Sequence, residues 1–342
     1  MAAPLHTTVI WANPAQLELA RALVQRAGLE LVAAGSPQKG QSGAVAAGLG
    51  TKAADDLRGV LHESRTDLVL LLAVGDFGAG AAAEDAGAVA AAHARGVRVL
   101  SAEPLPGNAL ELEAGGWTTL TPSPAASIRT LGLPRLSRVF REAQETLGAF
   151  GAARSVLVEH WAAPHQGSLG ARLVGAIDLV HWLVGETESI DAAYVPTGVG
   201  SRRLLEGAPS SVAGDLNATI RTVDGRSALI AVSNAAPRWN LCVTLLSEQG
   251  RLRFYDDGFE WLGPDGMKRD EHRDPARIRG SAAPDHAAEV LCESLWRVLD
   301  DALPDPGPLN VQSILPVAHA AMLSARTGSP ERPALIRSLI TT

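Results

Sequence analysis

Three titratable side chains in the sequence are placed so that they could take part in proton transfer. Glu103 comes directly before Pro104 at the end of an apolar run, and Asp178 and His181 lie three residues apart in a segment with helical periodicity. Residues three apart share nearly the same face of a helix, so this pair could act as a linked acid and base. A carboxyl group in a cleft can have a raised pKa, which would let Glu103 act as a general base. Glu103, Asp178 and His181 are therefore the candidate catalytic residues.

Each candidate also has a structural interpretation. A carboxylate that follows a strand, as Glu103 does, is more often a surface or hinge residue than a base. Asp178 could orient a substrate hydroxyl, or it could bond a neighbouring backbone or side-chain group, and the sequence favours neither. For His181, a packed structural histidine is favoured over a displaced acid or base.

A tryptophan and two histidines form a second group of candidates. His160 and Trp161 end a stretch, 154–161, whose side chains alternate between two faces as in a strand, and His165 follows. A tryptophan beside imidazoles suits stacking against a sugar, so these residues are candidates for a substrate cleft. The alternative is an ordinary sheet edge. No metal site is predicted, because no acid or thiolate completes a recognisable ligand spacing.

The elements that would position these residues fall into two groups. Four apolar runs alternate with helical patterns near the start of the chain, at 7–11, 29–34, 68–74 and 97–100. They predict an α/β Rossmann-like domain with a doubly wound parallel sheet over 1–125. Residues 126–342 are predicted to form an α+β domain. It begins with a helix over 136–147 and continues into strands at hairpin spacing, which form a large open antiparallel sheet.

Composition and charge exclude several kinds of partner. A formal net charge of -7, with no concentrated basic face, argues against nucleic-acid binding. The longest apolar run, 68–74, is far too short to cross a membrane, and no signal peptide is readable at the N-terminus. Two cysteines fifty residues apart, Cys242 and Cys292, fit a reducing compartment. The sequence therefore predicts a cytoplasmic protein.

The order of elements, with four local motifs, resembles the Gfo/Idh/MocA family of sugar and inositol dehydrogenases. Residues 97–104 (VRVLSAEP) resemble the family's strand that ends in Glu-Lys-Pro, and residues 167–185 resemble its central helix. Residues 245–255 resemble its Gly-x-x-Gly-x-Leu hairpin, and 319–328 its closing helix. The resemblance covers nearly the whole chain. It implies a two-domain oxidoreductase fold, and a homo-oligomer because family members typically pair through their sheets.

The residues at the expected cofactor site depart from that family. The resemblance places the site on Ala12, Asn13, Ser36 and Pro104, but the turn after the first strand, 11–16, contains no glycine. Glycines there permit a tight turn and close approach of the pyrophosphate, and proline has no N–H to offer it. The second strand ends in Ala-Gly-Ser rather than in an acid for the ribose. No cofactor is therefore expected.

The residues at the family's proton-transfer positions are also different. Aligned on Pro104, the family's lysine corresponds to Glu103. In the central helix, Gly175 stands where the family has its catalytic histidine, and Ala171 where it has its catalytic aspartate. Hydride transfer from an alcohol needs a group to take the hydroxyl proton, and none of these positions keeps the family's residue.

Three functions remain open from the sequence. The leading interpretation is an oxidoreductase-like protein that has lost this chemistry and serves as a binding or assembly component. Its partners would be an active paralogue, or a small sugar-like ligand. The second is a working NAD(P)-dependent sugar or polyol dehydrogenase with displaced catalytic residues. The third is a fold-only interaction protein that binds no small molecule.

The predicted open sheet also indicates self-association. Strands 227–233 and 240–247 are apolar on both faces, whereas a sheet with one face in water shows polar alternation. Apolar residues on both faces imply a second partner, which we expect to be another copy of the chain. The alternative is that the loop 265–284 folds over the outer face.

Overall fold

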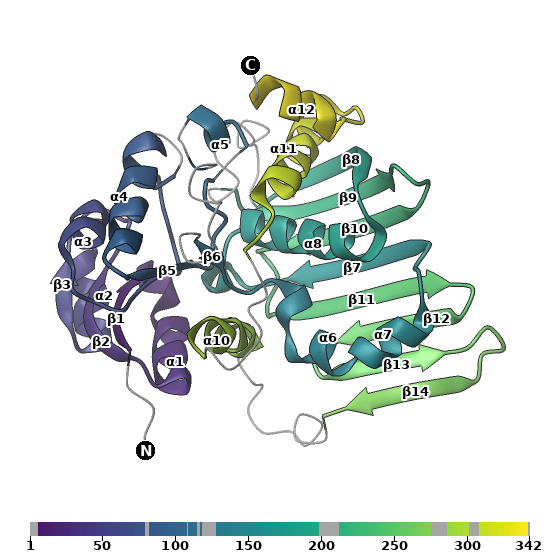
Figure 1. Cartoon of the computed structure of the whole chain (residues 1–342), viewed down its shortest axis with the longest axis horizontal. Coiled ribbons are helices and arrows are strands. Elements are labelled where there is room, and N and C mark those ends of the chain that lie inside the picture. The colour runs from purple at the N-terminus through teal and green to yellow at the C-terminus, as the bar shows by residue number, and fades with distance from the viewer. Residues whose placement is uncertain are drawn as a thin grey trace.

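The computed structural model describes residues 6–78, 82–107, 109–114, 117, 128–197, 212–274, 286–300 and 308–340, which form two sheets with helices packed on them (Figure 1). The first sheet has parallel strands in the order β3-β2-β1-β4-β5-β6. Its strands are β1 (Thr7–Trp11), β2 (Glu30–Gly35), β3 (Lys52–Ala54), β4 (Leu68–Leu71), β5 (Arg98–Ser101) and β6 (Arg129–Thr130). Its helices are η1 (Pro14–Gln16), α1 (Leu17–Ala27), α2 (Ser42–Leu49), α3 (Leu57–Glu63), α4 (Ala82–Ala94) and α5 (Glu111–Ala114).

The carboxyl ends of β1 and β4 mark the functional edge of this sheet. All four residues of β4 are fully buried, as expected for a strand covered on both faces. The strand order reverses between β1 and β4, which is where doubly wound sheets bind their ligands. Between β2 and β4 the chain forms α2, β3 and α3, because Gly50 ends α2 and Asp56 caps α3.

The second sheet has eight strands in the order β14-β13-β12-β11-β7-β10-β9-β8. The strands are β7 (Ser155–Trp161), β8 (Thr187–Pro196), β9 (Gly214–Thr222), β10 (Ser227–Ser233), β11 (Asn240–Ser247), β12 (Gly250–Tyr255), β13 (Gly258–Leu262) and β14 (Lys268–Arg273). The predicted fold class is confirmed, with one difference in strand direction. β7 and β10 are parallel neighbours, and every other pair is antiparallel. A parallel pair needs a long crossover, which α8, β8 and β9 supply.

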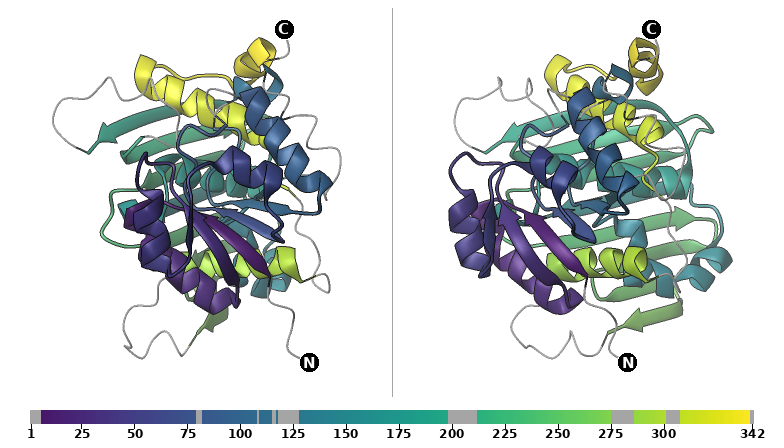
Figure 2. Two further views of the ribbon diagram at one scale, coloured as in Figure 1. Left: turned by 90° about the vertical axis from the view of Figure 1, so that its left-hand side faces the viewer. Right: turned by 60° about the vertical axis from the view of Figure 1, so that its left-hand side comes forward.

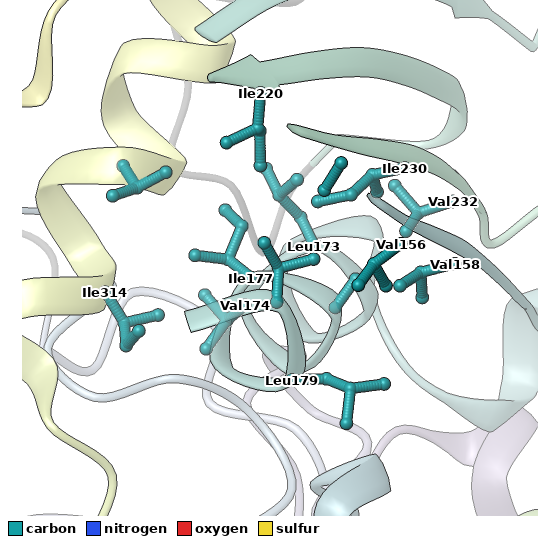
Figure 3. Close-up of a cluster of buried hydrophobic side chains, with 14 of the residues drawn as sticks. Val156, Val158, Leu173, Val174, Ile177, Leu179, Ile220, Ile230, Val232 and Ile314 are labelled. Carbon is teal, nitrogen blue, oxygen red and sulfur yellow. The ribbon is translucent and has the colours of Figure 1, made fainter. Parts of the chain in front are cut away.

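Helices cover the inner face of this sheet. The helices in this part of the chain are η4 (Pro134–Leu136), α6 (Arg138–Glu142), α7 (Gln144–Phe150), η5 (Pro164–Gln166), α8 (Leu169–Val184), α10 (His286–Leu299), α11 (Val311–Thr327) and α12 (Pro333–Ile340), of which α8 and α11 make most of the contact with the sheet. The helix predicted over 136–147 is interrupted at Ala143, between α6 and α7. Figure 3 shows Leu173 and Ile177 of α8 among the inward side chains of the sheet, including Val158 and Ile230. This cluster is the core of the second domain.

Two elements link the predicted domains. β6 pairs with β5, so the first sheet takes a strand from beyond the predicted boundary at residue 125. Late in the chain, α10 packs beside α1 of the first domain (Figure 2). Leu291 and Leu295 of α10 are buried in one apolar cluster with Leu19 and Leu23 of α1. The first domain is therefore completed by residues from the second half of the chain.

The outer face of the second sheet carries part of the predicted apolar surface. Leu229 points outward and is 48 % exposed, and Leu157 beside it is 36 % exposed. Val243 and Leu245, in contrast, point inward and are fully buried. Residues 268–273 of the loop predicted to cover this face form the edge strand β14 instead, and 275–284 lie outside the described residues. No helix in the described part of the chain is long and apolar enough to span a bilayer.

Candidate functional site

The turn after β1 is filled by its own side chains. The backbone N–H of Asn13 donates to Oε1 of Gln16 at 3.0 Å, and Nε2 of Gln16 donates to the carbonyl of Leu72 at 3.0 Å. Gln16 is buried, so its amide bridges the turn and the chain just beyond β4. An N–H that would face a phosphate is thereby occupied, and Pro14 has none.

Tryptophan also takes space at this edge of the sheet. Trp11 is buried, and a Cβ at Gly35 would lie 2.0 Å from its ring. Gly35, at the end of β2, is therefore held as glycine by the indole. The next residue, Ser36, is buried and accepts a hydrogen bond from the Gln38 N–H at 3.2 Å. The position where an acid would hold a ribose is thus a serine already used in its own turn.

The loops on either side of the β1 turn meet. β1 lies between β2 and β4, and a Cβ at Gly75, in the loop after β4, would lie 2.6 Å from Cβ of Pro37, in the loop after β2. A dinucleotide in a doubly wound fold crosses the carboxyl ends of these strands, with its pyrophosphate at the β1 turn. The residues present here do not fit that group, because Gln16 occupies the turn and Pro37 and Gly75 close the path across it.

Glu103 is buried at the junction of the two domains. It follows β5 and is 4 % exposed. Its carboxylate accepts a hydrogen bond from the Ser168 N–H at 3.0 Å and a short one from the Ser168 hydroxyl. Ser168 is the N-cap of α8, so a residue of the first domain is bonded to the first turn of a helix in the second. Burial raises the pKa of Glu103 from 4.5 to about 7, against the opposing effects of Ser168 and Arg172.

Behind Ser168 lies a buried cation. Arg172, one turn further along α8, is 3 % exposed, and burial lowers its pKa to about 10. Its guanidinium lies 4.5 Å from the ring centroid of Trp239, and its Nη1 is 3.0 Å from Nε2 of His160. Since arginine only donates, Nε2 of His160 is the acceptor and the imidazole is neutral. Burial, aided by the charge of Arg172, holds the pKa of His160 well below its usual value.

The position of the family's catalytic histidine is closed by packing. A Cβ at Gly175 would lie 3.1 Å from Cδ of Pro134 and 3.6 Å from Cε1 of His160. A larger side chain would have to displace both neighbours. At the position of the family's aspartate, the N–H of Ala171 donates to the Ser168 hydroxyl at 3.0 Å as part of the helix cap. The helix is built here for packing and capping.

Asp178 is held in an ion pair. Its Oδ2 lies 2.6 Å from Nε of Arg135, and both side chains are mostly buried. Burial raises the pKa of Asp178, while Arg135 and His181 oppose that rise. His181 is half-buried in the last turn of α8. Asp178 and His181 therefore lie near each other as predicted from their spacing, but no contact joins them to Glu103.

The three residues of the predicted substrate cleft do not come together. His160 points inward and is fully buried, whereas Trp161 lies on the opposite face of the sheet and is 37 % exposed. Adjacent strand residues point to opposite faces, which accounts for this separation. His165 is exposed in η5. Of the predicted cofactor residues, Ala12, Ser36 and Pro104 are buried and Asn13 is half-buried.

Two features of the junction were missed from the sequence. The first is the buried Ser168–Arg172 pair, which the apolar periodicity of α8 obscures. The second is a repeated pattern, Trp-Ala-x-Pro-x-Gln, at 11–16 and 161–166. Each copy follows a strand, and in the second copy the Ala163 N–H donates to Oε1 of Gln166 at 2.9 Å. The two turns, η1 and η5, pack against each other across the junction. The repeat itself is visible in the sequence.

Comparison with solved structures finds the same fold in dehydrogenases and oxidoreductases, some of them in complex with NAD+ or NADH. A levoglucosan dehydrogenase in complex with NADH and levoglucosan is 14 % identical, with a TM-score of 0.67 over 96 % of this chain and 99 % of that one. An oxidoreductase from Agrobacterium radiobacter, in complex with NAD+, L-tartaric acid and magnesium, is 14 % identical, with a TM-score of 0.67 over 97 % and 100 %.

A UDP-N-acetylglucosamine 3-dehydrogenase from Acidithiobacillus ferrooxidans is 14 % identical, with a TM-score of 0.64 over 95 % of this chain and 99 % of that one. No family model matches the chain, and no curated protein matches it in sequence. At such identities the likeness establishes the fold, and the predicted resemblance is confirmed at that level.

Proposed function

We propose that this chain is a binding or assembly protein built on a dehydrogenase fold, without nicotinamide chemistry of its own. The observation that carries the proposal is the closed turn after β1. Gln16 takes the Asn13 N–H and reaches Leu72, and Pro37 meets Gly75 across the same edge. A pyrophosphate depends on free backbone N–H groups and close backbone approach, and this turn offers little of either.

The proton-transfer positions support the same proposal. Glu103 stands at the family's lysine position, and its carboxylate is engaged by Ser168. Gly175 and Ala171, at the other two positions, have no ionisable side chain. A general base must reach the hydroxyl proton of its substrate, and a carboxylate bonded twice inside a domain junction is poorly placed to do so.

Titration with NADH and NADPH tests the proposal. Isothermal calorimetry at tens of micromolar protein should show no binding of either nucleotide in the micromolar range, because the pyrophosphate finds its turn already filled. Gln16→Ala provides a further test. It frees the Asn13 N–H but leaves Pro37 against Gly75, so it should bind no better. Micromolar affinity in the unmodified protein would overturn the proposal.

A working NAD(P)-dependent dehydrogenase is the second candidate. One observation favours it: burial raises the pKa of Glu103 to about 7, which is near the optimum for a general base at neutral pH. The two candidates differ in turnover. We expect no oxidation of inositol, glucose or related polyols with either nucleotide, and no gain from Glu103→Lys. Activity in the unmodified protein that Glu103→Gln abolishes would instead make Glu103 the base.

We also propose that a second copy of the chain binds the outer face of the second sheet. The face has a hollow of about 460 Å³, whose outward lining includes Leu157, Leu229, Ala231, Thr219, Glu159 and Asp191. Exposed leucines beside small side chains favour a protein partner over solvent. The alternative partners are an active paralogue and a small sugar-like ligand. A pull-down with tagged paralogue subunits tests the first alternative, because a complex of the two chains would be recovered.

A further inference from the structure

One carboxyl group forms a buried polar link between the two domains. Glu103 follows β5 of the first sheet, and both of its donors belong to Ser168 at the amino end of α8. The link is remote from water, since Glu103 and Ser168 are 4 % and 8 % exposed. A hydrogen-bonded carboxylate in such a place keeps its charge only against a large desolvation cost.

The groups facing Glu103 do not remove that cost. On α8 they are the Ser168 hydroxyl and the more distant Arg172, and on β7 His160 lies behind Arg172 as a neutral imidazole. His165 of η5 is exposed. His160 lies against Arg172 and Gly175 of α8 and against Trp239, all in the second domain, so separating Glu103 from α8 leaves His160 covered.

Small residues from two turns also meet beside this link. Ala12 and Ala162, from the two Trp-Ala-x-Pro-x-Gln turns, are buried in one apolar cluster, and η1 packs on η5. On the far side, α10 packs beside α1 and is bonded to the second domain, where the Arg138 N–H donates to Glu293 at 2.8 Å. The junction thus joins the two domains through α10, through Trp239 and the two turns, and through one buried carboxyl group. Movement between domains is the usual behaviour of such interfaces.

We propose that Glu103 and the amino end of α8 form a proton-controlled contact between the two domains: the contact stays closed while the carboxyl carries a proton, and it opens more often once the carboxyl ionises. When the contact opens, the carboxylate reaches water and the Ser168 N–H loses its acceptor. Protonation reverses this, since a neutral carboxyl is far less costly to bury and still bonds the Ser168 hydroxyl.

The size of the effect follows from linkage. The pKa of Glu103 is about 7 when it is buried, against 4.5 when it is solvated. The folded, closed state therefore binds the proton more tightly, and closure is favoured as the pH falls. Between pH 6 and pH 8 these two values change the equilibrium constant for opening by roughly tenfold.

Amide hydrogen exchange measures this opening directly. The reporters are the amides of Ser168, Ala163 and Asn13, and the amides of β4 serve as the internal control for global unfolding. From pH 6 to pH 8 the protection factors of the reporters should fall roughly tenfold, while β4 stays more protected than the reporters at each pH. Reporter protection that does not change with pH in the unmodified protein, or that equals the protection of β4 at every pH, overturns the proposal.

Two variants separate Glu103 from other titrating groups. Glu103→Gln keeps the shape and cannot ionise, so the protection factors of its reporters should be independent of pH, although His165 and the remaining histidines are unchanged. Ser168→Ala removes the hydroxyl bond that lowers the pKa of Glu103, so the transition should move to higher pH. A pH dependence that survives Glu103→Gln overturns the assignment. None of these outcomes depends on whether NADH binds.

Discussion

Placing a histidine at Gly175 tests whether packing leaves room for the residue that the resemblance to the Gfo/Idh/MocA family expects there. Even a Cβ there would lie 3.1 Å from Cδ of Pro134, so the ring must displace Pro134 or His160. Overpacking a core costs about 1–3 kcal/mol, and burying an imidazole without partners costs about 1–3 kcal/mol more. Gly175→His should therefore lower the free energy of unfolding by roughly 2–6 kcal/mol and yield no dehydrogenase activity.

Urea unfolding followed by circular dichroism measures this loss as a lower midpoint. The matched control is Gly87→Ala on α4, where a Cβ meets nothing within 4 Å and the residue is exposed. That variant should gain about 0.5–1 kcal/mol, because alanine favours the helix over glycine. If Gly175→His proves as stable as the unmodified protein, room for the histidine exists and the packing argument is wrong.

The remaining predictions concern ionisable groups and the outer face. In thermal unfolding, Asp178→Asn should lower the free energy of unfolding by about 3–5 kcal/mol, because it leaves the mostly buried Arg135 unpaired. The control, Glu186→Gln at the exposed pair with Arg337, should change the free energy of unfolding by less than about 1 kcal/mol. The raised pKa of Glu103 contributes about 3 kcal/mol of stability, which is complete below pH 4.5 and is lost as the pH rises through 7. In denaturant titrations at several pH values, Glu103→Gln should remove this dependence of the free energy of unfolding on pH. An unchanged dependence would contradict the raised pKa. Light scattering at tens of micromolar protein should show a dimer, and Leu229→Asp should disrupt the dimer without loss of fold. Val243→Asp and Leu245→Asp should instead unfold the chain, because both side chains face the core. A monomer in the unmodified protein would refute pairing through the sheet.

The sequence predicts elements well where burial alone determines them. β4 is apolar at every position because helices cover both of its faces, and its run is plain in the sequence. The sequence of β14, by contrast, is Lys-Arg-Asp-Glu-His-Arg. It is an exposed edge strand, so no hydrophobic pattern predicts it. The parallel pairing of β7 with β10 depends on a crossover of some sixty residues, which strand periodicity does not encode.

The candidate site can be predicted from the sequence only where its residues are neighbours in the chain. The missing glycines at 11–16 are visible in the sequence, whereas the bond from Gln16 to the Leu72 carbonyl joins residues fifty-six apart and appears only on folding. The same holds for Glu103, whose position in a strand-end motif was clear. Its burial depends on Ser168, sixty-five residues away, whereas the sequence alone favours a surface or hinge carboxylate. Partners distant in the sequence therefore decide whether an acidic side chain acts as a general base, bonds one domain to the other or stays solvated.

Three contacts fill the edge of the first sheet at which a doubly wound fold binds its ligand. Trp11 packs on Gly35, Gln16 spans the turn, and Pro37 closes on Gly75, so replacing any one side chain leaves the others in place. The second domain repeats the Gln-closed turn at Gln166 and sets it against the first. Trp11, Gln16 and Pro37 make these contacts within the first domain, while the packing of η1 on η5 crosses to the second. A pyrophosphate depends on open backbone at this turn, so a turn filled by side chains supports the proposal of a protein without nicotinamide chemistry of its own. Under the further proposal, the proton on Glu103 controls how often the contact between the domains opens.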